Sequence, residues 1–176
     1  KEAEELLDTS RRVSEEVEKR LEKLLRESER VAEEIRKRLE ELLRRVEKVL
    51  DELRKARDDK RKVLEEVTRA LEDVERRVEE INRENKEEAD RVRRDVERID
   101  EENKRAAEEV KERARKRGID EKVLKTIEDE HRRLSESVER VLRTAKRLHD
   151  EVSKEVRDVL EEIRRTVEKI IREVRT

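Results

Sequence analysis

Two histidines, His131 and His149, are the side chains of this sequence best suited to proton transfer or metal binding. Each is followed four residues later by a serine, Ser135 or Ser153, so imidazole and hydroxyl would share one helix face. A histidine that contacts a serine forms part of a nucleophilic triad, and a histidine among carboxylates can hold a metal ion. Both kinds of chemistry require further groups that converge on the ring.

The surroundings predicted for the two rings supply few such groups. The histidines are one 18-residue interval apart, about 27 Å along a straight helix, so they cannot share one ion. Asp100 is the one carboxylate that we expect near His131, and Asn82 has the equivalent place near His149. A zinc site needs three or four converging ligands, and catalysis needs a pocket for substrate, which a packed bundle lacks. We therefore predict no metal, no cofactor and no enzymatic activity.

The composition restricts the fold to helices. The chain has 176 residues with no proline, one glycine and no aromatic residue, and 59% of its residues are charged. Sandwiches, barrels and α/β folds need frequent turn residues, which are missing here. Glu, Arg, Lys, Leu and Ala are strong helix formers, so we predict an all-α fold.

The charges and the short apolar runs argue against several kinds of partner. The 51 basic and 53 acidic residues nearly cancel and are interspersed, which leaves no basic stripe for phosphates. No aromatic side chain could stack on a base, and the longest apolar run, two residues, is too short to span a membrane. We expect a soluble chain, suited to cytoplasmic expression, that needs no nucleic acid, membrane or other partner.

An 18-residue repeat organises the sequence. Residues 10–27 read SRRVSEEVEKRLEKLLRE, and residues 28–45 read SERVAEEIRKRLEELLRR. One such repeat over five turns gives the natural helix period, about 3.6 residues per turn, so it predicts straight helices without a supercoil. The inward positions that it predicts in the first segment are Leu6, Ser10, Val13, Val17, Leu21, Leu24, Ser28, Val31, Ile35, Leu39, Leu42, Val46, Val49 and Leu53.

Two places in the chain carry signals for a turn. Gly118 fits the position just past a helix end, and Asp120 fits the cap of the next helix. Ile119 can then pack on Leu124 across that helix start. The second signal is weaker: Asp58–Asp59 is a poor helical dipeptide, and its second residue can cap a following helix.

These signals predict one domain, residues 1–176, built as a straight, antiparallel three-helix bundle that runs up, down and up. The apolar pattern continues through Asp58–Asp59 without a jump, so one helix over residues 1–117 is the alternative, and it would require oligomerisation. We expect a monomer, with a helix-exchanged or higher oligomer as the other possibility. The helices of the monomer are expected at about 1–57, 60–117 and 120–176.

Polar residues replace apolar ones at matching heights of the three predicted helices. If the chain folds antiparallel, the first polar layer holds a serine, an asparagine and a histidine, the second layer repeats these types, and the third is all valine. Smaller polar side chains flank the first two layers. The layers are Ser10, Asn103 and His131; Ser28, Asn85 and His149; and Val46, Val67 and Val167; the flanking residues are Ser14, Asn82, Asp100, Ser135 and Ser153.

The physical role predicted for the polar layers is specificity. A buried imidazole, amide or hydroxyl costs about 1–3 kcal/mol when it has no partner, so the chain favours the register that pairs these groups. Polar residues in coiled-coil cores set register in this way, at some cost in stability.

The repeat, the Glu/Lys/Arg surface, the missing aromatics and the layered Ser, Asn and His positions resemble parametrically designed helical bundles with buried hydrogen-bond networks. The resemblance covers the whole chain and implies a stable scaffold with no natural substrate. Asp58–Asp59 departs from it, because designed loops usually contain glycine. Two alternatives remain: a functionalised design, such as a pH-responsive bundle or an assembly subunit, and a natural spectrin-like spacer, although natural three-helix repeats usually carry aromatic residues.

The expected shape can be measured directly. Three side-by-side helices of about 57 residues predict a monomer about 85–90 Å long, and small-angle X-ray scattering at several protein concentrations should give this maximum dimension. A particle of roughly 175 Å, as expected for a continuous helix over residues 1–117, would contradict the three-helix monomer, as would a stable dimer.

Overall fold

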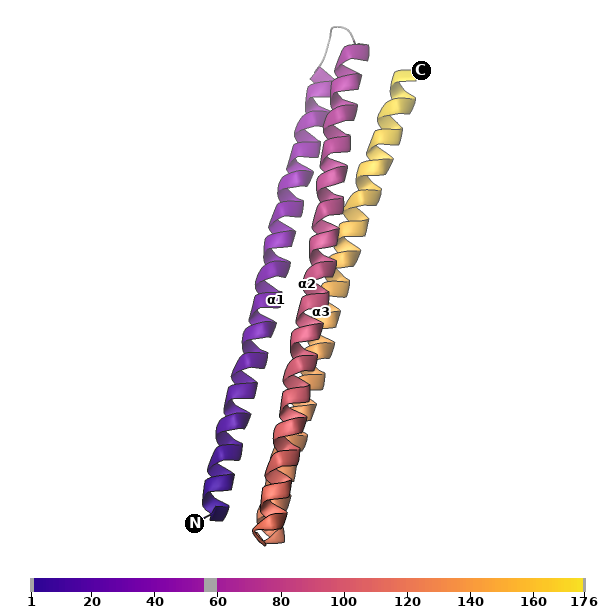
Figure 1. Cartoon of the computed structure of the whole chain (residues 1–176). Helices are drawn as coiled ribbons and strands as arrows, with labels where there is room; N and C mark the ends of the chain where they lie inside the picture. The colour runs from indigo at the N-terminus through magenta and orange to yellow at the C-terminus, as the bar shows by residue number, and fades with distance from the viewer. Residues whose placement is uncertain (1, 56–59, 176) are drawn as a thin grey trace. The chain divides into compact units, whose positions relative to one another are not determined.

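The computed structural model describes residues 2–55 and 60–175, which form three α-helices and no strand (Figure 1). The all-α, three-helix prediction is therefore confirmed, while the antiparallel and untwisted arrangement remains a prediction. The helix ends lie close to the predicted ones. The helices are α1 (Glu2–Lys55), α2 (Lys60–Lys116) and α3 (Glu121–Arg175).

The first predicted turn, Asp58–Asp59, lies outside the described residues. Contacts between α1 and α2 nevertheless exclude one continuous helix. The guanidinium of Arg45 on α1 lies 3.8 Å from the Asp73 carboxylate on α2. On one continuous helix these two positions would be about 42 Å from each other, so the two segments must lie side by side here.

The second turn, between α2 and α3, has the geometry expected at Gly118. Gly118 has φ = 62°, a left-handed conformation that glycine adopts without strain. Its N–H donates to the carbonyl of Arg115, and the N–H of Ile119 donates to the carbonyl of Ala114. These two bonds form a Schellman motif, which satisfies carbonyls that the helix end would leave unpaired.

The start of α3 also follows the prediction. Asp120 precedes the first helical residue, and its carboxylate accepts a 3.4 Å hydrogen bond from the N–H of Lys122. Ile119 and Leu124 both pack against one small apolar cluster, which ties the chain on either side of the cap together. The sequence from Gly118 to Leu124 thus carries a complete helix stop and start signal.

By its internal contacts the chain divides into two compact units, each containing a part of all three helices. Unit 1 comprises Lys1–Glu29 and Ala89–Arg147, and unit 2 comprises Arg30–Glu88 and Leu148–Thr176. Each unit has its own apolar core and its own buried polar residues, so each is described by itself below. Whether residues 1–176 form one domain remains a prediction.

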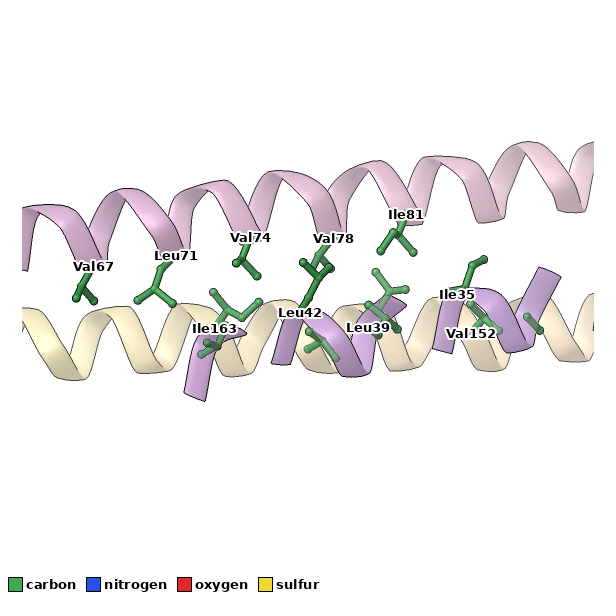
Figure 2. Packing of buried hydrophobic residues seen from close by; sticks show 14 of the residues in the cluster. Ile35, Leu39, Leu42, Val67, Leu71, Val74, Val78, Ile81, Val152 and Ile163 are labelled. Atoms are coloured by element: carbon green, nitrogen blue, oxygen red, sulfur yellow. The ribbon is translucent and has the colours of Figure 1, made fainter. Parts of the chain in front are cut away.

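Aliphatic side chains from all three helices form the core of unit 2. Figure 2 shows Leu71 and Val74 of α2 pointing toward the helices that carry Leu42 and Ile163. Val46 and Val67 of the predicted all-valine layer are buried, and Val167 packs against the same cluster. Val and Ile have one strongly preferred side-chain rotamer in a helix, which suits a well-ordered core without aromatic residues.

Unit 1 has two smaller apolar clusters. The larger one joins residues such as Leu21 of α1, Val96 of α2 and Leu134 of α3. The smaller one lies beside the Gly118 turn and contains Leu6, Ala114 and Ile127.

Ion pairs between α1 and α2 follow the same repeat as the core. In unit 1 Arg20 pairs with Glu102 at 2.9 Å, and in unit 2 Arg38 pairs with Glu84. A step of one repeat forward on α1 therefore corresponds to a step of one repeat backward on α2. These side chains are about half exposed, so each pair contributes about 0–1 kcal/mol.

A second set of ion pairs keeps this spacing but reverses its charges. In unit 1 the acid is on α1, where Glu27 lies 3.5 Å from Arg91 of α2. At the equivalent positions of unit 2, one repeat away on each helix, the base is on α1 and Arg45 faces Asp73. The two units are thus alike in apolar pattern and different in the sign of these charges.

The Gly118 turn generates a prediction about backbone strain. A Cβ added at Gly118 meets no atom within 4 Å, so Gly118→Ala tests the left-handed φ alone. We expect a loss of about 1–2 kcal/mol in the free energy of unfolding, measured by urea titration with far-UV circular dichroism. Gly118→Asn should lose less, because asparagine tolerates this conformation. Equal losses for the two variants would contradict this account.

Candidate functional site

The buried polar side chains of the described residues all belong to the two predicted polar layers. Among those residues, the polar side chains that are buried are Ser10 and Asn103 from the first layer and Ser28, Asn85 and His149 from the second. The remaining predicted residues are half-buried: His131, Ser135, Ser153, Ser14, Asn82 and Asp100. In an apolar core such groups require hydrogen-bond partners, so their contacts define the candidate site.

In unit 2 the amide of Asn85 joins α2 to α3 through three contacts. Its Nδ2 donates 3.1 Å hydrogen bonds to the backbone carbonyl of His149 and to Oγ of Ser153. Its Oδ1 lies 3.0 Å from Nδ1 of the His149 ring. Asn85 and His149 are 1% and 4% exposed, so these bonds form out of contact with bulk water.

These contacts determine which ring nitrogen of His149 carries the proton. A backbone carbonyl can only accept, so the amide must turn its Nδ2 toward it and its Oδ1 toward the ring. Since Oδ1 is an acceptor, Nδ1 is the donor of the ring contact. The neutral ring therefore has its proton on Nδ1 and a lone pair on Nε2.

The surroundings of His149 favour its neutral form. Burial lowers the pKa of His149 below its usual value of about 6.5 because a charged ring would lose its hydration. The carboxylates of Glu88 on α2 and Asp150 on α3 act in the opposite direction and raise this pKa in part.

Unit 1 has a simpler arrangement around His131. Its Nδ1 lies 3.2 Å from Oδ1 of Asn103, which gives the same ring–amide contact as in unit 2. Ser10, which was predicted to share this layer, is buried, but its hydroxyl donates a 2.8 Å hydrogen bond to the carboxylate of Glu130. The structure thus brings Asn103 and His131 together and gives Ser10 a partner that the sequence analysis missed.

The expectation that Asp100 is the one carboxylate near His131 also needs correction, because Glu130 acts on this ring. Its carboxylate lies 3.1 Å from Nζ of Lys104, one turn along α2. The carboxylate that raises the pKa of His131 is that of Glu130, whereas burial, the larger effect, and the charge of Lys111 both lower it. Glu130 directly precedes His131, and nothing in the apolar pattern distinguished it from a solvent-exposed glutamate.

Several buried polar atoms lack a hydrogen-bond partner within the described residues. They are Oγ of Ser14, Oγ of Ser28, Nε2 of His131 and Nε2 of His149. The predicted layers are therefore present in part. Each contains a bonded Asn–His pair, and the serines on α1 are not bonded to that pair within the residues that the structure describes.

No family model and no curated protein matches this chain. A solved structure described as a "Computationally designed three helix bundle" is similar, with 16% sequence identity and a TM-score of 0.46. The similarity covers 98% of this chain and 82% of that one.

The groups around the rings limit the chemistry that the site could carry out. Among residues 2–55 and 60–175, no three His, Asp or Glu side chains come together as ligands for a metal ion. In each pair, an asparagine amide of α2 engages ring Nδ1 of a histidine of α3, so these contacts join the two helices.

No helix in the described part of the chain is long and apolar enough to cross a membrane.

The different number of bonds at the two asparagines generates a prediction. Asn85→Ala removes three contacts and leaves Nδ1 of His149 unpaired, whereas Asn103→Ala removes one contact beside a half-buried ring. We expect Asn85→Ala to lower the free energy of unfolding by about 1–3 kcal/mol more than Asn103→Ala. Urea unfolding of both variants measures the difference, and since both make the same truncation, an equal loss would show that the extra bonds contribute nothing.

Proposed function

We propose that this chain is a designed structural scaffold, an antiparallel three-helix bundle with no natural substrate, whose Asn–His pairs fix the register of α2 against α3. The proposal requires no cofactor and no partner chain. The proposed role concerns the relative position of the helices, because the bonded asparagine and histidine of each pair lie on different helices.

The observation that carries the proposal is that both pairs have the same offset. His149 follows His131 by one repeat on α3, and Asn85 precedes Asn103 by one repeat on α2. In each unit the same contact forms, ring Nδ1 to amide Oδ1. From unit 1 to unit 2 the histidine number rises by one repeat while the asparagine number falls by one repeat. The same offset in both units, with the two helices numbered in opposite directions, supports a single antiparallel register.

The alternative registers explain why polar pairs are useful here. An apolar stripe with steps of three and four residues fits its partner helix at several offsets, so Val and Leu discriminate weakly between them. A shifted α2 would place Asn85 or Asn103 against aliphatic side chains, and each unpaired buried amide would cost about 1–3 kcal/mol. The polar pairs therefore contribute to the choice of register more than to stability.

A spin-label experiment separates register from stability. The chain contains no cysteine, so Glu65→Cys and Lys154→Cys, both at exposed positions of unit 2, provide unique labelling sites on α2 and α3. Double electron–electron resonance should give one narrow distance distribution. In the same labelled protein, the added pair Asn85→Leu and His149→Leu should broaden or split this distribution. The free energy of unfolding should change by less than about 1 kcal/mol, because both hydrogen-bond partners are removed together.

A matched control substitutes two apolar residues of the same unit, Val74→Leu and Val159→Leu, and should leave a single narrow distribution. If replacing the polar pair also leaves the distribution narrow, the pair does not determine register and the proposal fails. If the pair's removal instead lowers stability by several kcal/mol, its role is ordinary stabilisation.

A further inference from the structure

The Asn85–His149 pair has a feature that a register-fixing contact does not need. Its ring can be protonated, but no hydrogen-bond acceptor in the described residues faces the nitrogen that would take the proton. With Nδ1–H donated to Asn85, the ring can gain a proton only at Nε2. That atom is buried and has no hydrogen-bond partner in the described part of the chain. A protonated His149 would therefore hold both a charge and an unpaired N–H inside the core, and both are costly.

The charges around His149 only partly offset that cost. Glu88 of α2 and Asp150 of α3 are the charged groups that favour protonation by raising the pKa of His149, and both lie outside α1. His149 is 4% exposed, so the ring cannot hydrate without moving out of the core. Such a movement breaks the bond between the ring and Oδ1 of Asn85, which is one of the three bonds that join α2 to α3 here.

The ring in unit 1 shares the buried Nε2 that has no partner in the described residues, but it differs in the exposure of its residue and in the number of bonds to its asparagine. His131 is half-buried as a residue, whereas His149 is buried, and its contact with Asn103 is a single bond. Glu130 of α3 stabilises its charged form, Lys111 of α2 opposes it, and on α1 the facing polar group is Ser10, which donates to Glu130. Movement of the His131 ring would break one hydrogen bond at a residue that is already half-buried, so its protonation should disturb the contact between α2 and α3 less.

We propose that the Asn85–His149 pair is an acid-sensitive clamp, so that mild acid loosens α3 from α2 in unit 2 while the Asn103–His131 pair of unit 1 remains closed. This goes beyond the scaffold function proposed above, since it adds a controllable response to a structural contact.

The direction of the pH effect follows from proton linkage. The folded pKa of His149 is lowered, so between that pKa and the unfolded value of about 6.5 the unfolded state binds more protons than the folded state. Stability due to the neutral ring is therefore fully present above about pH 6.5 and is lost as the pH falls toward the folded pKa. Each pKa unit of lowering corresponds to about a tenfold increase in the population of the opened form at low pH.

The two histidines can be titrated individually in the unmodified chain. Because the sequence contains no Phe, Tyr or Trp, the carbon-bound aromatic protons in its NMR spectrum come from His131 and His149 alone. The His131→Asn variant assigns the two signals. We expect both rings to titrate below about 6.5, because burial lowers the pKa of each. A His149 signal that titrates at or above that value would overturn the proposal.

Hydrogen–deuterium exchange tests whether protonation opens the clamp. Protection of the backbone around Asn85 and His149 should fall about tenfold or more between about pH 7 and pH 5, after correction for intrinsic exchange, and protection around Asn103 and His131 should fall less. In His149→Asn, which keeps a polar side chain without a titration in this range, the extra fall in unit 2 should disappear. If the fall persists in that variant, or if unit 1 loses protection first, the acid response belongs to other groups and the proposal is wrong.

Discussion

Burying a polar side chain in an apolar core is costly unless a hydrogen-bond partner lies opposite it, and the Asn–His pairs meet this constraint at two places along α2 and α3. The aliphatic residues around them supply most of the burial, but they do so at any offset that keeps stripe against stripe. In the structure both amide–imidazole contacts form at the same offset of α2 against α3. The rest of the bundle, including the interhelical ion pairs, is compatible with that offset and does not by itself impose it.

The two pairs are chemically alike and differ in their surroundings. Asn85 bonds the ring, the backbone carbonyl and a serine hydroxyl, and this saturation fixes the amide orientation and therefore the ring tautomer. Asn103 has one bond to a ring that is closer to solvent and to the carboxylate of Glu130. A repeated sequence unit thus gives one contact of three hydrogen bonds at a buried histidine and one contact of a single hydrogen bond at a half-buried histidine.

The repeat predicted helices and the polar residues that the core buries, and the helix stop and cap signals predicted the turn at Gly118, because each of these depends on local periodicity or capping chemistry. Details that depend on how side chains extend were not predictable. Ser10 reaches Glu130, Asp100 turns to Lys104, and Ala32 is buried although the pattern placed Val31 inward. In a sequence that is 59% charged, a glutamate beside the core resembles every other glutamate, so no pattern marks the one that contacts the layer.

The reversed ion pairs have a consequence for encounters between copies of the chain. Because the repeat is regular, α1 of one molecule could lie against α2 of another molecule at a position shifted by one repeat, and the apolar stripes would still match. Such a displacement would bring Arg45 against Arg91, or Glu27 against Asp73, and like charges would face each other at the rim of the contact. The surface thus distinguishes two stretches of helix that the core treats as equivalent, and it disfavours staggered association into open-ended fibres.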